Sequence, residues 1–326
     1  MMPQRHYCTL FDCNYLIKGL AMLRSICEHS PGASVWVLCL DDHARSLLDR
    51  LAIPGVHTMA LVEVETPDVL EAKKTRSIAE YCWTLSSVLM WHVMQSRPEI
   101  DLLTYLDADL LFFSPVERLF EEMGSGSIAV IEHRYTPRLR HLEVYGRFNV
   151  QWVSFRRDEQ GLDCLRTWRD QCVEWCYAVL SDGKLGDQKY LDAWPSRYSG
   201  FRNLQHVGAG LAPWNYPNYR IADREGRLYV DDRPLIFYHF HQFQILENGA
   251  YDYCSSNYTK DGEPPEAVYG RYRAATSISL AELQQLEPGF ALGIKGASSV
   301  TLRRIAQRYL PAGLKNVLHR IGVHAK

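Results

Sequence analysis

Short apolar runs alternate along this chain with longer segments in which apolar residues recur every three or four positions. The runs at residues 7–11 and 35–40 predict two strands, and the periodic segment at 15–27 between them predicts a helix. The chain therefore opens with a β-α-β unit, which is the usual start of a nucleotide-binding sheet.

The same two patterns continue over most of the sequence. They predict further helices at residues 44–51, 77–95, 116–123 and 158–179, and further strands at 57–62, 102–106, 127–132, 149–155 and 234–243. Strands that alternate with helices favour an α/β protein built on a largely parallel sheet. Residues 248–279 are instead rich in Tyr, Ser, Gly and Pro, which predicts an irregular segment.

Two carboxylates follow one of these strands. The run at 102–106 is too short for an ordinary helix and is apolar on both faces, so it predicts a buried parallel strand. Asp107 and Asp109 come directly after it, with only Ala108 between them. The carboxyl ends of parallel strands form a ligand crevice, and a divalent cation with oxygen ligands would relieve the repulsion between the two acids.

A purely structural role for this pair is the alternative. Asp107 would then cap the following turn and Asp109 would lie in solvent, with Ser114 and Pro115 starting the next helix. The apolar strand in front of the pair and the Phe-Phe-Ser-Pro turn behind it favour the metal site.

Polar residues also follow the first strand. Asp12 and Asn14 suit contacts to a base or ribose, and Tyr15 offers a stacking face, although Asp12 or Asn14 can equally cap the next helix. Arg76 belongs to a basic segment at 73–76 that would face phosphates or would simply be a solvated charge run.

Two histidines end the strand predicted at 234–243. His239 and His241 share one face if the backbone is extended. An imidazole beside two carboxylates makes a nitrogen and oxygen site that suits Mn²⁺ or Mg²⁺, whereas a single histidine on an aromatic strand is usually a hydrogen-bonded core residue. Asp187 and Gln188 precede a helical turn, where they can serve as an N-terminal cap.

Composition and charge exclude several classes of protein. A net charge of −2 over 326 residues gives no reason to expect a nucleic-acid partner. The N-terminus lacks the apolar core of a signal peptide, and no apolar run approaches the roughly 20 residues that span a bilayer, so we expect a cytoplasmic protein. Nine cysteines, scattered through apolar segments, are interpreted as reduced core residues.

The last segment has a different charge balance. Residues 288–326 contain no acid but several arginines and lysines, and their apolar positions recur at helical spacing. This pattern predicts one or two amphipathic helices at 300–326 that dock the protein on an anionic membrane surface on the inner face of the membrane. The alternative is a terminal helix that packs its apolar stripe on the rest of the protein.

The order of these motifs resembles that of the GT-A glycosyltransferases, which use nucleotide-sugar donors and consist of a single Rossmann-like mixed sheet flanked by helices. The resemblance is strongest to the retaining enzymes of glycosyltransferase family eight and to their bacterial polysaccharide-cluster relatives. It covers residues 7–245. The matching elements are Asp12-Cys13-Asn14-Tyr15, Tyr105-Leu106-Asp107-Ala108-Asp109, Phe148-Asn149, Asp187-Gln188, and His239 at the end of a strand.

This resemblance assigns roles to the candidate residues. It implies that Asp107, Asp109 and His239, with His241 as the alternative, bind the divalent ion that holds the diphosphate of the donor. It implies catalytic positions for Asp187 and Gln188, beside the sugar and its anomeric carbon. The nucleotide-sugar-binding set then comprises Asp12, Asn14, Tyr15, Arg76, Asp107, Ala108, Asp109 and Asn149. The nucleoside is most often uridine in such enzymes.

Two positions depart from the family pattern. The family usually has glycine two residues after the asparagine, where this chain has Gln151, and glycine three residues after the metal histidine, where it has Gln242. The first departure concerns the acceptor side. The second concerns the contact to the pyrophosphate and the choice between His239 and His241.

We therefore predict a catalytic GT-A domain at residues 1–247, an irregular excursion at 248–299 that packs on it, and the C-terminal helical basic extension at 300–326. The predicted activity is transfer of a hexose, with retention, from a UDP-sugar to a glycan or lipid-linked acceptor. Two alternatives are a non-catalytic nucleotide-sugar-binding protein and a phosphohydrolase with an aspartate nucleophile. In the latter class the acid pair follows the first strand, whereas here it follows about a hundred residues.

Overall fold

The computed structural model of the chain describes residues 4–296. The basic segment at 300–326 lies outside the described residues, so its predicted helices and membrane docking stay predictions. Within residues 4–296, no helix is long and apolar enough to cross a membrane.

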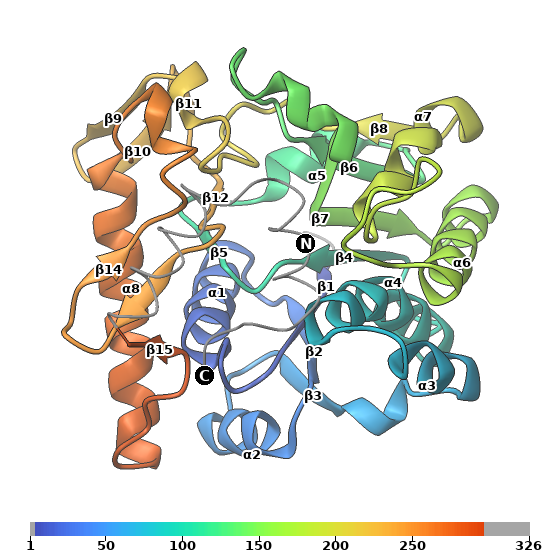
Figure 1. The fold of residues 1–326 in the computed structure, drawn as a ribbon, viewed down its shortest axis with the longest axis horizontal. Coiled ribbons are helices and arrows are strands. Elements are labelled where there is room, and N and C mark those ends of the chain that lie inside the picture. Colours follow the sequence, from blue (N-terminus) through green and yellow to red (C-terminus); the bar gives the residue numbers. More distant parts are fainter. Residues whose placement is uncertain (1–3, 297–326) are drawn as a thin grey trace.

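Among the described residues, a seven-stranded sheet forms the centre of the protein, in the order β3-β2-β1-β4-β7-β6-β8 (Figure 1). Its strands are β1 (His6–Phe11), β2 (Ser34–Cys39), β3 (Val56–Ala60), β4 (Leu102–Leu106), β6 (Ile128–Glu132), β7 (Phe148–Arg156) and β8 (Phe201–Asn203). The pairs β1–β2, β1–β4, β2–β3 and β6–β8 are parallel, whereas β7 runs antiparallel to both of its neighbours. The sheet is therefore mixed, as the family resemblance of the sequence implied.

Helices cover both faces of this sheet (Figure 1). One core contains apolar residues of α1 (Leu16–His29), α2 (Asp42–Leu51), α5 (Glu117–Met123) and α8 (Glu266–Leu286). The other contains apolar residues of α3 (Pro67–Lys73), α4 (Ile78–Ser96), α6 (Glu159–Glu174) and α7 (Trp194–Arg197). Local chemistry fixes the ends of these helices: α4 starts at a reciprocal cap, in which Ser77 and Glu80 each accept a backbone N–H from the other.

Small sheets and short helices complete the fold. The antiparallel pair β5 (Leu110–Phe112) and β12 (Phe237–His239) lies beside the end of β4. The others are β9 (Ile221–Arg224), β10 (Arg227–Val230) and β11 (Arg233–Pro234), followed by β13 (Gln244–Leu246), β14 (Tyr251–Asp252) and β15 (Ile294–Lys295). The 3₁₀ helices are η1 (Leu61–Glu63), η2 (Arg140–Tyr145), η3 (Gln188–Ala193), η4 (Tyr216–Asn218) and η5 (Thr259–Asp261).

The segment at 248–299 differs from its predicted irregular structure. Residues Glu266–Leu286 form the long helix α8, which packs against α1. Its buried positions do recur at helical spacing, but Thr276 and Ser279 occupy two of them, so the apolar pattern is interrupted. The prediction of an irregular excursion is therefore wrong for this helix, because polar residues hide its buried face.

Smaller differences lie at the ends of elements. The helix predicted at 158–179 ends at Glu174, and the strand predicted at 57–62 gives way to η1 after Ala60. The strand predicted at 234–243 is divided: only Phe237–His239 pairs with β5, and the chain turns before β13. That short pairing determines where the two predicted histidines lie.

Candidate active site

Two elements bring Asp107, Asp109 and His239 together at the carboxyl edge of the sheet. Both aspartates lie in the turn that follows β4, and β5 starts directly after Asp109. β5 pairs with β12 in a register that places His239 opposite Leu110. The backbone N–H of Phe240 also donates to the carbonyl oxygen of Asp109, at 2.9 Å.

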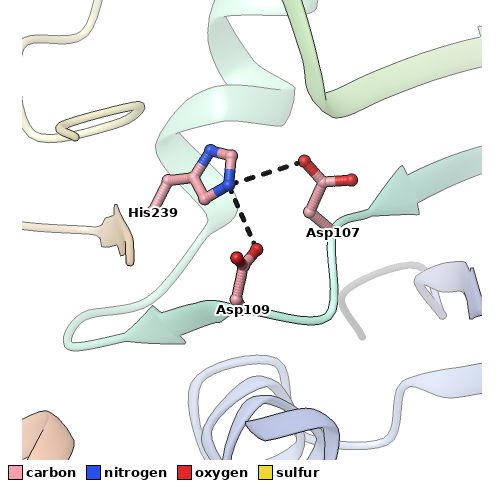
Figure 2. A group of neighbouring side chains, drawn as sticks. All are labelled: Asp107, Asp109 and His239. Atoms are coloured by element: carbon pink, nitrogen blue, oxygen red, sulfur yellow. Dashed lines mark ion pairs between the residues drawn. The ribbon is translucent and has the colours of Figure 1, made fainter. Parts of the chain in front are cut away.

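The imidazole of His239 lies between the two carboxylates (Figure 2). Its Nε2 atom is 3.1 Å from Oδ1 of Asp109 and 3.8 Å from Oδ2 of Asp107. One candidate ligand atom from each of the three residues lies within 4.8 Å of the others. Asp109 and His239 are buried and Asp107 is partly buried, so the alternative in which Asp109 lies in solvent does not hold.

The electrostatics of the three groups are coupled. Burial raises the pKa of Asp107 to about 6. The positive charge of His239 acts to lower this pKa, and the negative charge of Asp109 acts to raise it. Burial also raises the pKa of Asp109, but the charge of His239 and its hydrogen bond outweigh burial, so this pKa is low. Burial lowers the pKa of His239, and Asp109 more than offsets this, so that pKa is raised.

The Nε2 atom of His239 faces a carboxylate oxygen of each aspartate, which is where a cation would be attracted. A histidine binds a metal ion in its neutral form, so metal binding would compete with protonation of His239. Two carboxylates and one imidazole form a donor set that fits Mn²⁺ or Mg²⁺.

Lys18 was not among the predicted site residues. It is buried in the first turns of α1, and its charge helps to lower the pKa of Asp109 after the larger effects of burial and His239. Its Nζ atom lies 4.5 Å from the ring centroid of Tyr15. The apolar periodicity of α1 gave no sign that one lysine would face the acid pair.

The residues after β1 lie at the rim of the same site. The Tyr15 side chain is 41% exposed; partial burial raises the pKa of its hydroxyl, and the charges of Asp109 and Asp107 raise it further. The carboxylate of Asp12 accepts from Asn14 Nδ2 at 2.9 Å and from the Tyr15 backbone N–H at 3.1 Å. Asp12 thus holds the turn into α1, while Asn14 and the Tyr15 ring stay accessible.

Asp187 and Gln188 approach from a different part of the chain. Asp187 is buried, and burial, followed by the charge of Asp107, raises its pKa to about 7. Gln188 Nε2 donates to the carbonyl oxygen of Tyr145 at 3.0 Å. Asp187 precedes η3 but makes no side-chain cap there, so the capping alternative does not hold.

The predicted nucleotide-sugar residues Asn149 and Arg76 differ in their surroundings. Asn149 is buried on β7, where its amide contacts His133 and the Gln151 backbone. Arg76 donates to the carbonyl oxygens of Val173 and Glu174 at the end of α6 and stacks on Tyr177, with 3.8 Å between guanidinium carbon and ring centroid. These contacts give Arg76 a structural role and do not join it to the acid pair.

Trp214 forms a wall beside the candidate metal cluster and was not among the predicted site residues. Its ring is buried and meets the rings of His239 and His241 edge-on, with centroid distances of 5.2 and 5.4 Å. Asn215 fixes this loop, because its amide accepts from the Ala212 N–H and donates to the carbonyl oxygens of His133 and Gly210. In the described residues, His239 rather than His241 belongs to the candidate metal cluster.

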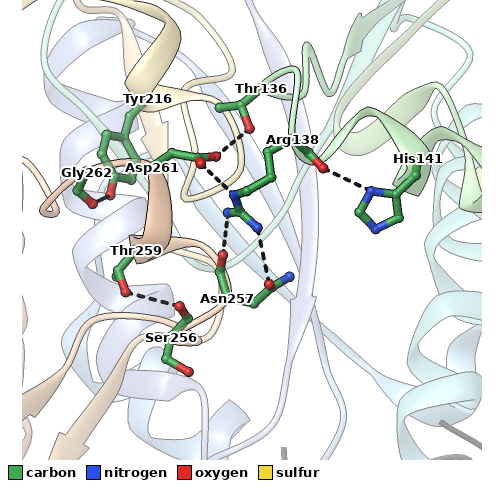
Figure 3. Close-up of polar contacts among 9 residues, drawn as sticks. All are labelled: Thr136, Arg138, His141, Tyr216, Ser256, Asn257, Thr259, Asp261 and Gly262. Carbon is green, nitrogen blue, oxygen red and sulfur yellow. Dashed lines mark hydrogen bonds and ion pairs between the residues drawn. The ribbon is translucent and has the colours of Figure 1, made fainter. Parts of the chain in front are cut away.

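A polar network ties two further loops together next to this wall (Figure 3). Arg138 Nε donates to Asp261 at 2.5 Å, and Arg138 Nη2 donates to the carbonyl oxygen of Asn257 at the same distance. Asp261 also accepts from the Thr136 hydroxyl at 2.6 Å. The segment after β14 is thereby anchored to the loop between β6 and β7, and its Tyr258 ring lies 6.2 Å from that of His241.

The two departures from the family pattern also have structural counterparts. Gln242 has a φ of +66°, a left-handed conformation that favours glycine. Gln151 is fully buried, and neither atom of its amide has a hydrogen-bond partner among the described residues. A Cβ atom on Gly210 would lie 3.2 Å from its Nε2, so this amide is packed tightly against the loop that carries Trp214.

No protein-family model matches the chain. Two proteins of Bacillus subtilis (strain 168) are similar to it in sequence. The uncharacterized protein YfnD is 32% identical over 295 residues, which cover 90% of this chain and 95% of YfnD. The uncharacterized protein YfnF is 30% identical over 250 residues, which cover 74% of this chain and 82% of YfnF.

Solved structures are similar to the fold at low sequence identity. An active-site mutant of LgtC has a TM-score of 0.51 and 13% identity, with 84% of this chain and 95% of that chain covered. The glycosyltransferase GlyE of Streptococcus pneumoniae TIGR4 has a TM-score of 0.48 and 14% identity, with 87% and 64% covered. The mixed sheet flanked by helices matches the GT-A glycosyltransferase fold, which confirms the predicted fold class.

Proposed function

The chain belongs to the same family as YfnD of Bacillus subtilis, and we propose that it is a metal-dependent glycosyltransferase that uses a UDP-sugar donor. The observation that supports this most strongly is the convergence of Asp107, Asp109 and His239 at the carboxyl edge of a GT-A sheet. That edge is where open α/β sheets bind their ligands.

Asp107, Asp109 and His239 would hold Mn²⁺ or Mg²⁺, and the donor set, the burial and the coupled charges of these residues fit such an ion. When bound, the ion would supply positive charge to the diphosphate of the donor, both in the bound donor and as the sugar–phosphate bond breaks. The aspartates and the imidazole would orient that charge, and the Trp214 ring packs edge-on against His239 on one side.

The residues after β1 suit the nucleoside. The exposed ring of Tyr15 offers a stacking face, and Asp12 and Asn14 offer polar atoms to a base or ribose. Lys18 lies beneath the Tyr15 ring, where its charge would add to the field that attracts a diphosphate. Arg76 is not part of this proposal, because its guanidinium is held by α6.

The proposed transfer exchanges one bond for another. The bond from the anomeric carbon to the β-phosphate oxygen breaks, and a bond from that carbon to an acceptor hydroxyl oxygen forms. The proton of the acceptor hydroxyl passes to the departing phosphate, so a strong base on the protein is not required. The resemblance to family eight supports retention, and Asp187 and Gln188 are placed in this proposal beside the sugar.

The acceptor and the outer segments extend the proposal. We propose a glycan or lipid-linked saccharide as the acceptor. The catalytic domain would comprise residues 1–247, and the segment at 248–299 would pack on it through the contact between α8 and α1. The basic segment at 300–326 would bind an anionic membrane surface. Co-sedimentation with acidic liposomes at low salt tests this: binding lost on truncation before Val300 supports it, and unchanged binding contradicts it.

A thermal-shift panel of UDP, UDP-glucose, UDP-galactose and UDP-N-acetylglucosamine, each with and without Mn²⁺, tests the proposed function. A ligand present at 100 times its Kd stabilises the folded state by about 2.7 kcal/mol, so we expect a Tm increase that needs uridine nucleotide and Mn²⁺ together. The Asp109→Asn variant should lose this joint effect. If no uridine nucleotide shifts the Tm of the wild-type protein in the presence of Mn²⁺, the proposal is wrong.

Turnover separates the enzyme from the alternatives. Release of UDP from one of these donors in the presence of a saccharide acceptor is the expected result. Binding without release would instead identify a nucleotide-sugar-binding protein. Release of inorganic phosphate from a simple phosphomonoester would favour the aspartate-nucleophile phosphohydrolase, which no contact of the described residues supports over the transferase.

A further inference from the structure

His133 lies behind Asn149, and no motif of the sequence pointed to it. Its Nε2 atom is 2.9 Å from Nδ2 of Asn149, and both side chains are more than nine-tenths buried. Asn149 also accepts the Gln151 backbone N–H at 2.9 Å through its Oδ1 atom. Because a primary amide has two N–H groups and two carbonyl lone pairs, Asn149 keeps one donor and one acceptor for a ligand.

The orientation of this amide follows from one backbone carbonyl. His133 Nδ1 lies 3.2 Å from the carbonyl oxygen of Arg147, which can only accept a hydrogen bond. Nδ1 must therefore carry the imidazole proton, which leaves Nε2 as an acceptor for the amide N–H of Asn149. Burial lowers the pKa of His133 to about 4, so the ring is neutral at physiological pH. These two hydrogen bonds thus determine which of the two terminal atoms of the Asn149 amide is the nitrogen.

The His133 ring itself is fixed by its neighbours. It stacks on Tyr135 with a centroid distance of 4.7 Å and an interplanar angle of 7°, and it packs against Trp214 at 5.1 Å. Asn215 donates to the backbone carbonyl oxygen of His133 at 2.8 Å. Trp214 is the same residue that meets His239 edge-on, so His133 and the candidate metal cluster share one wall.

Asn149 is also close to the acid pair along the sheet. It precedes Gln151 by two residues on β7, and the carbonyl oxygen of Gln151 accepts the backbone N–H of Asp107 at 3.2 Å. The pairing of β6 with β7 shifts register at this point, between Val130 and Ile131. Such a bulge re-aims side chains, and here the Asn149 side chain bonds across it to the Gln151 N–H.

We propose that His133 is a positioning residue that orients the amide of Asn149 towards a hydroxyl group of the donor sugar. The inference rests on the proposed function, because it takes Asn149 as a contact to the nucleotide sugar. His133 touches no substrate in this account. It acts through the tautomer that the Arg147 carbonyl imposes and through the rigid stack with Tyr135.

The consequence is a difference between sugar and nucleotide recognition. His133→Leu leaves the Asn149 amide without its acceptor and free to rotate, so kcat/KM for the UDP-sugar should fall about 10- to 100-fold. The Kd of UDP in the presence of Mn²⁺ should stay within about twofold, because the nucleotide contacts lie after β1. His133→Gln, whose Oε1 can accept from Asn149, should recover part of the loss.

A double-mutant cycle separates positioning from general structure. If His133 acts through Asn149, then Asn149→Ala combined with His133→Leu should be no worse than Asn149→Ala alone. His141→Gln is the matched control, because His141 lies in the same connection between β6 and β7, is exposed, and donates from Nδ1 to the carbonyl oxygen of Arg138. Additive losses, an unchanged kcat/KM in His133→Leu, or an equal loss of UDP affinity would each overturn the proposal.

The tautomer offers a test that does not depend on folding of a variant or on turnover. In the ¹⁵N spectrum of the wild-type imidazoles, His133 should carry its proton on Nδ1 and leave Nε2 unprotonated. A proton on Nε2 in the wild-type protein would overturn the proposal. If the wild-type protein neither binds nor turns over any UDP-sugar, the proposed function fails, and this spectrum still decides the His133–Asn149 geometry on its own.

Discussion

Charged side chains lie at both edges of the central sheet, but their balance differs. At the amino edge, Arg5 donates to both carboxylate oxygens of Glu117, and Arg156 donates to Asp101 at 3.1 Å. These residues lie in or beside a cavity of about 580 Å³ next to the starts of β1 and β4. At the carboxyl edge, Asp107 and Asp109 share one histidine.

The charged residues at the amino edge form ion pairs that stabilise the fold, whereas the acids at the carboxyl edge are suited to bind a cation. Each of the two arginines at the amino edge is paired with a carboxylate of its own. At the other edge, burial and mutual repulsion raise the pKa of Asp107 and of Asp187, which means that the fold holds these acids at a cost in stability. Raised pKa values of buried acids are typical of functional sites.

The largest expected effect comes from neutralising Asp109 at the carboxyl edge, compared with neutralising Asp101 at the amino edge. Asp109→Asn keeps the shape but removes the carboxylate that is closest to His239, so glycosyl transfer should fall by roughly 100- to 1000-fold, as when one charge-stabilising group is lost. Asp101→Asn is the matched control at the amino edge and should leave kcat/KM unchanged. Equal activity in both variants would remove the distinction between the edges.

The two histidines give the next largest effect. His239→Gln removes a proposed metal ligand, so Mn²⁺ binding should weaken by on the order of 100-fold, at least as much as when a residue that only supports a ligand is removed. His241→Gln should change it by much less, because His241 is a ring neighbour 5.6 Å from His239 and lies outside the cluster. Isothermal titration with Mn²⁺ measures both. The reverse order of losses would shift the metal ligand by two residues.

Asp187 should show opposite effects on stability and activity. Its pKa is raised to about 7, so the folded metal-free protein binds this proton more tightly than the unfolded chain and loses stability as pH rises from about 4 to 7. Asp187→Asn should remove this loss and make the protein more stable than wild type at pH 8, by on the order of 4 kcal/mol, with the difference shrinking towards pH 5. Urea unfolding at the two pH values measures it.

Transfer activity of Asp187→Asn is measured on the same preparation and should fall, since the acid is assigned to the sugar. A variant that is less stable than wild type at pH 8 would contradict the idea that burial of Asp187 is costly. A variant with full activity would remove Asp187 from the catalytic assignment while leaving the metal cluster unaffected.

The smallest effect is expected at the amino edge. Arg5→Met should lower the free energy of unfolding by about 1 kcal/mol, because the Arg5–Glu117 pair is only partly exposed and the guanidinium also lies 4.0 Å above the Phe120 ring. Donor affinity should not change. A loss of UDP binding in this variant would mean that the two edges are coupled.

The sequence allowed much of the fold to be predicted because its strands and helices follow their own periodicity. The β-α-β start, β4 and the long helix α4 come from apolar patterns that tertiary contacts do not override. The helix α8 escaped prediction because Thr276 and Ser279 lie at buried positions on it. The short strand β5 escaped because three residues after an acid pair carry too little pattern.

Only those residues of the candidate site that belong to a sequence motif could be predicted. The position of Asp107 and Asp109 after a strand suggested a metal site, and the family resemblance of the sequence added His239 to it. Lys18, Trp214 and His133 depend on how a helix and two loops pack, and no local pattern distinguishes them from ordinary surface or core residues. Arg76 shows the converse. Its basic segment suggested phosphate binding, but in the structure its guanidinium donates to carbonyl oxygens at the end of α6.

Asp107, Asp109 and His239 are proposed to hold a divalent cation that binds the diphosphate of the donor. Crystals grown with Mn²⁺ and UDP, measured for the anomalous signal of manganese, test this proposal. We expect one strong peak within coordination distance of a carboxylate oxygen of each aspartate and of Nε2 of His239, with phosphate oxygens on its open side. A peak elsewhere, or UDP bound at the carboxyl edge with no ion between these three residues, would contradict it.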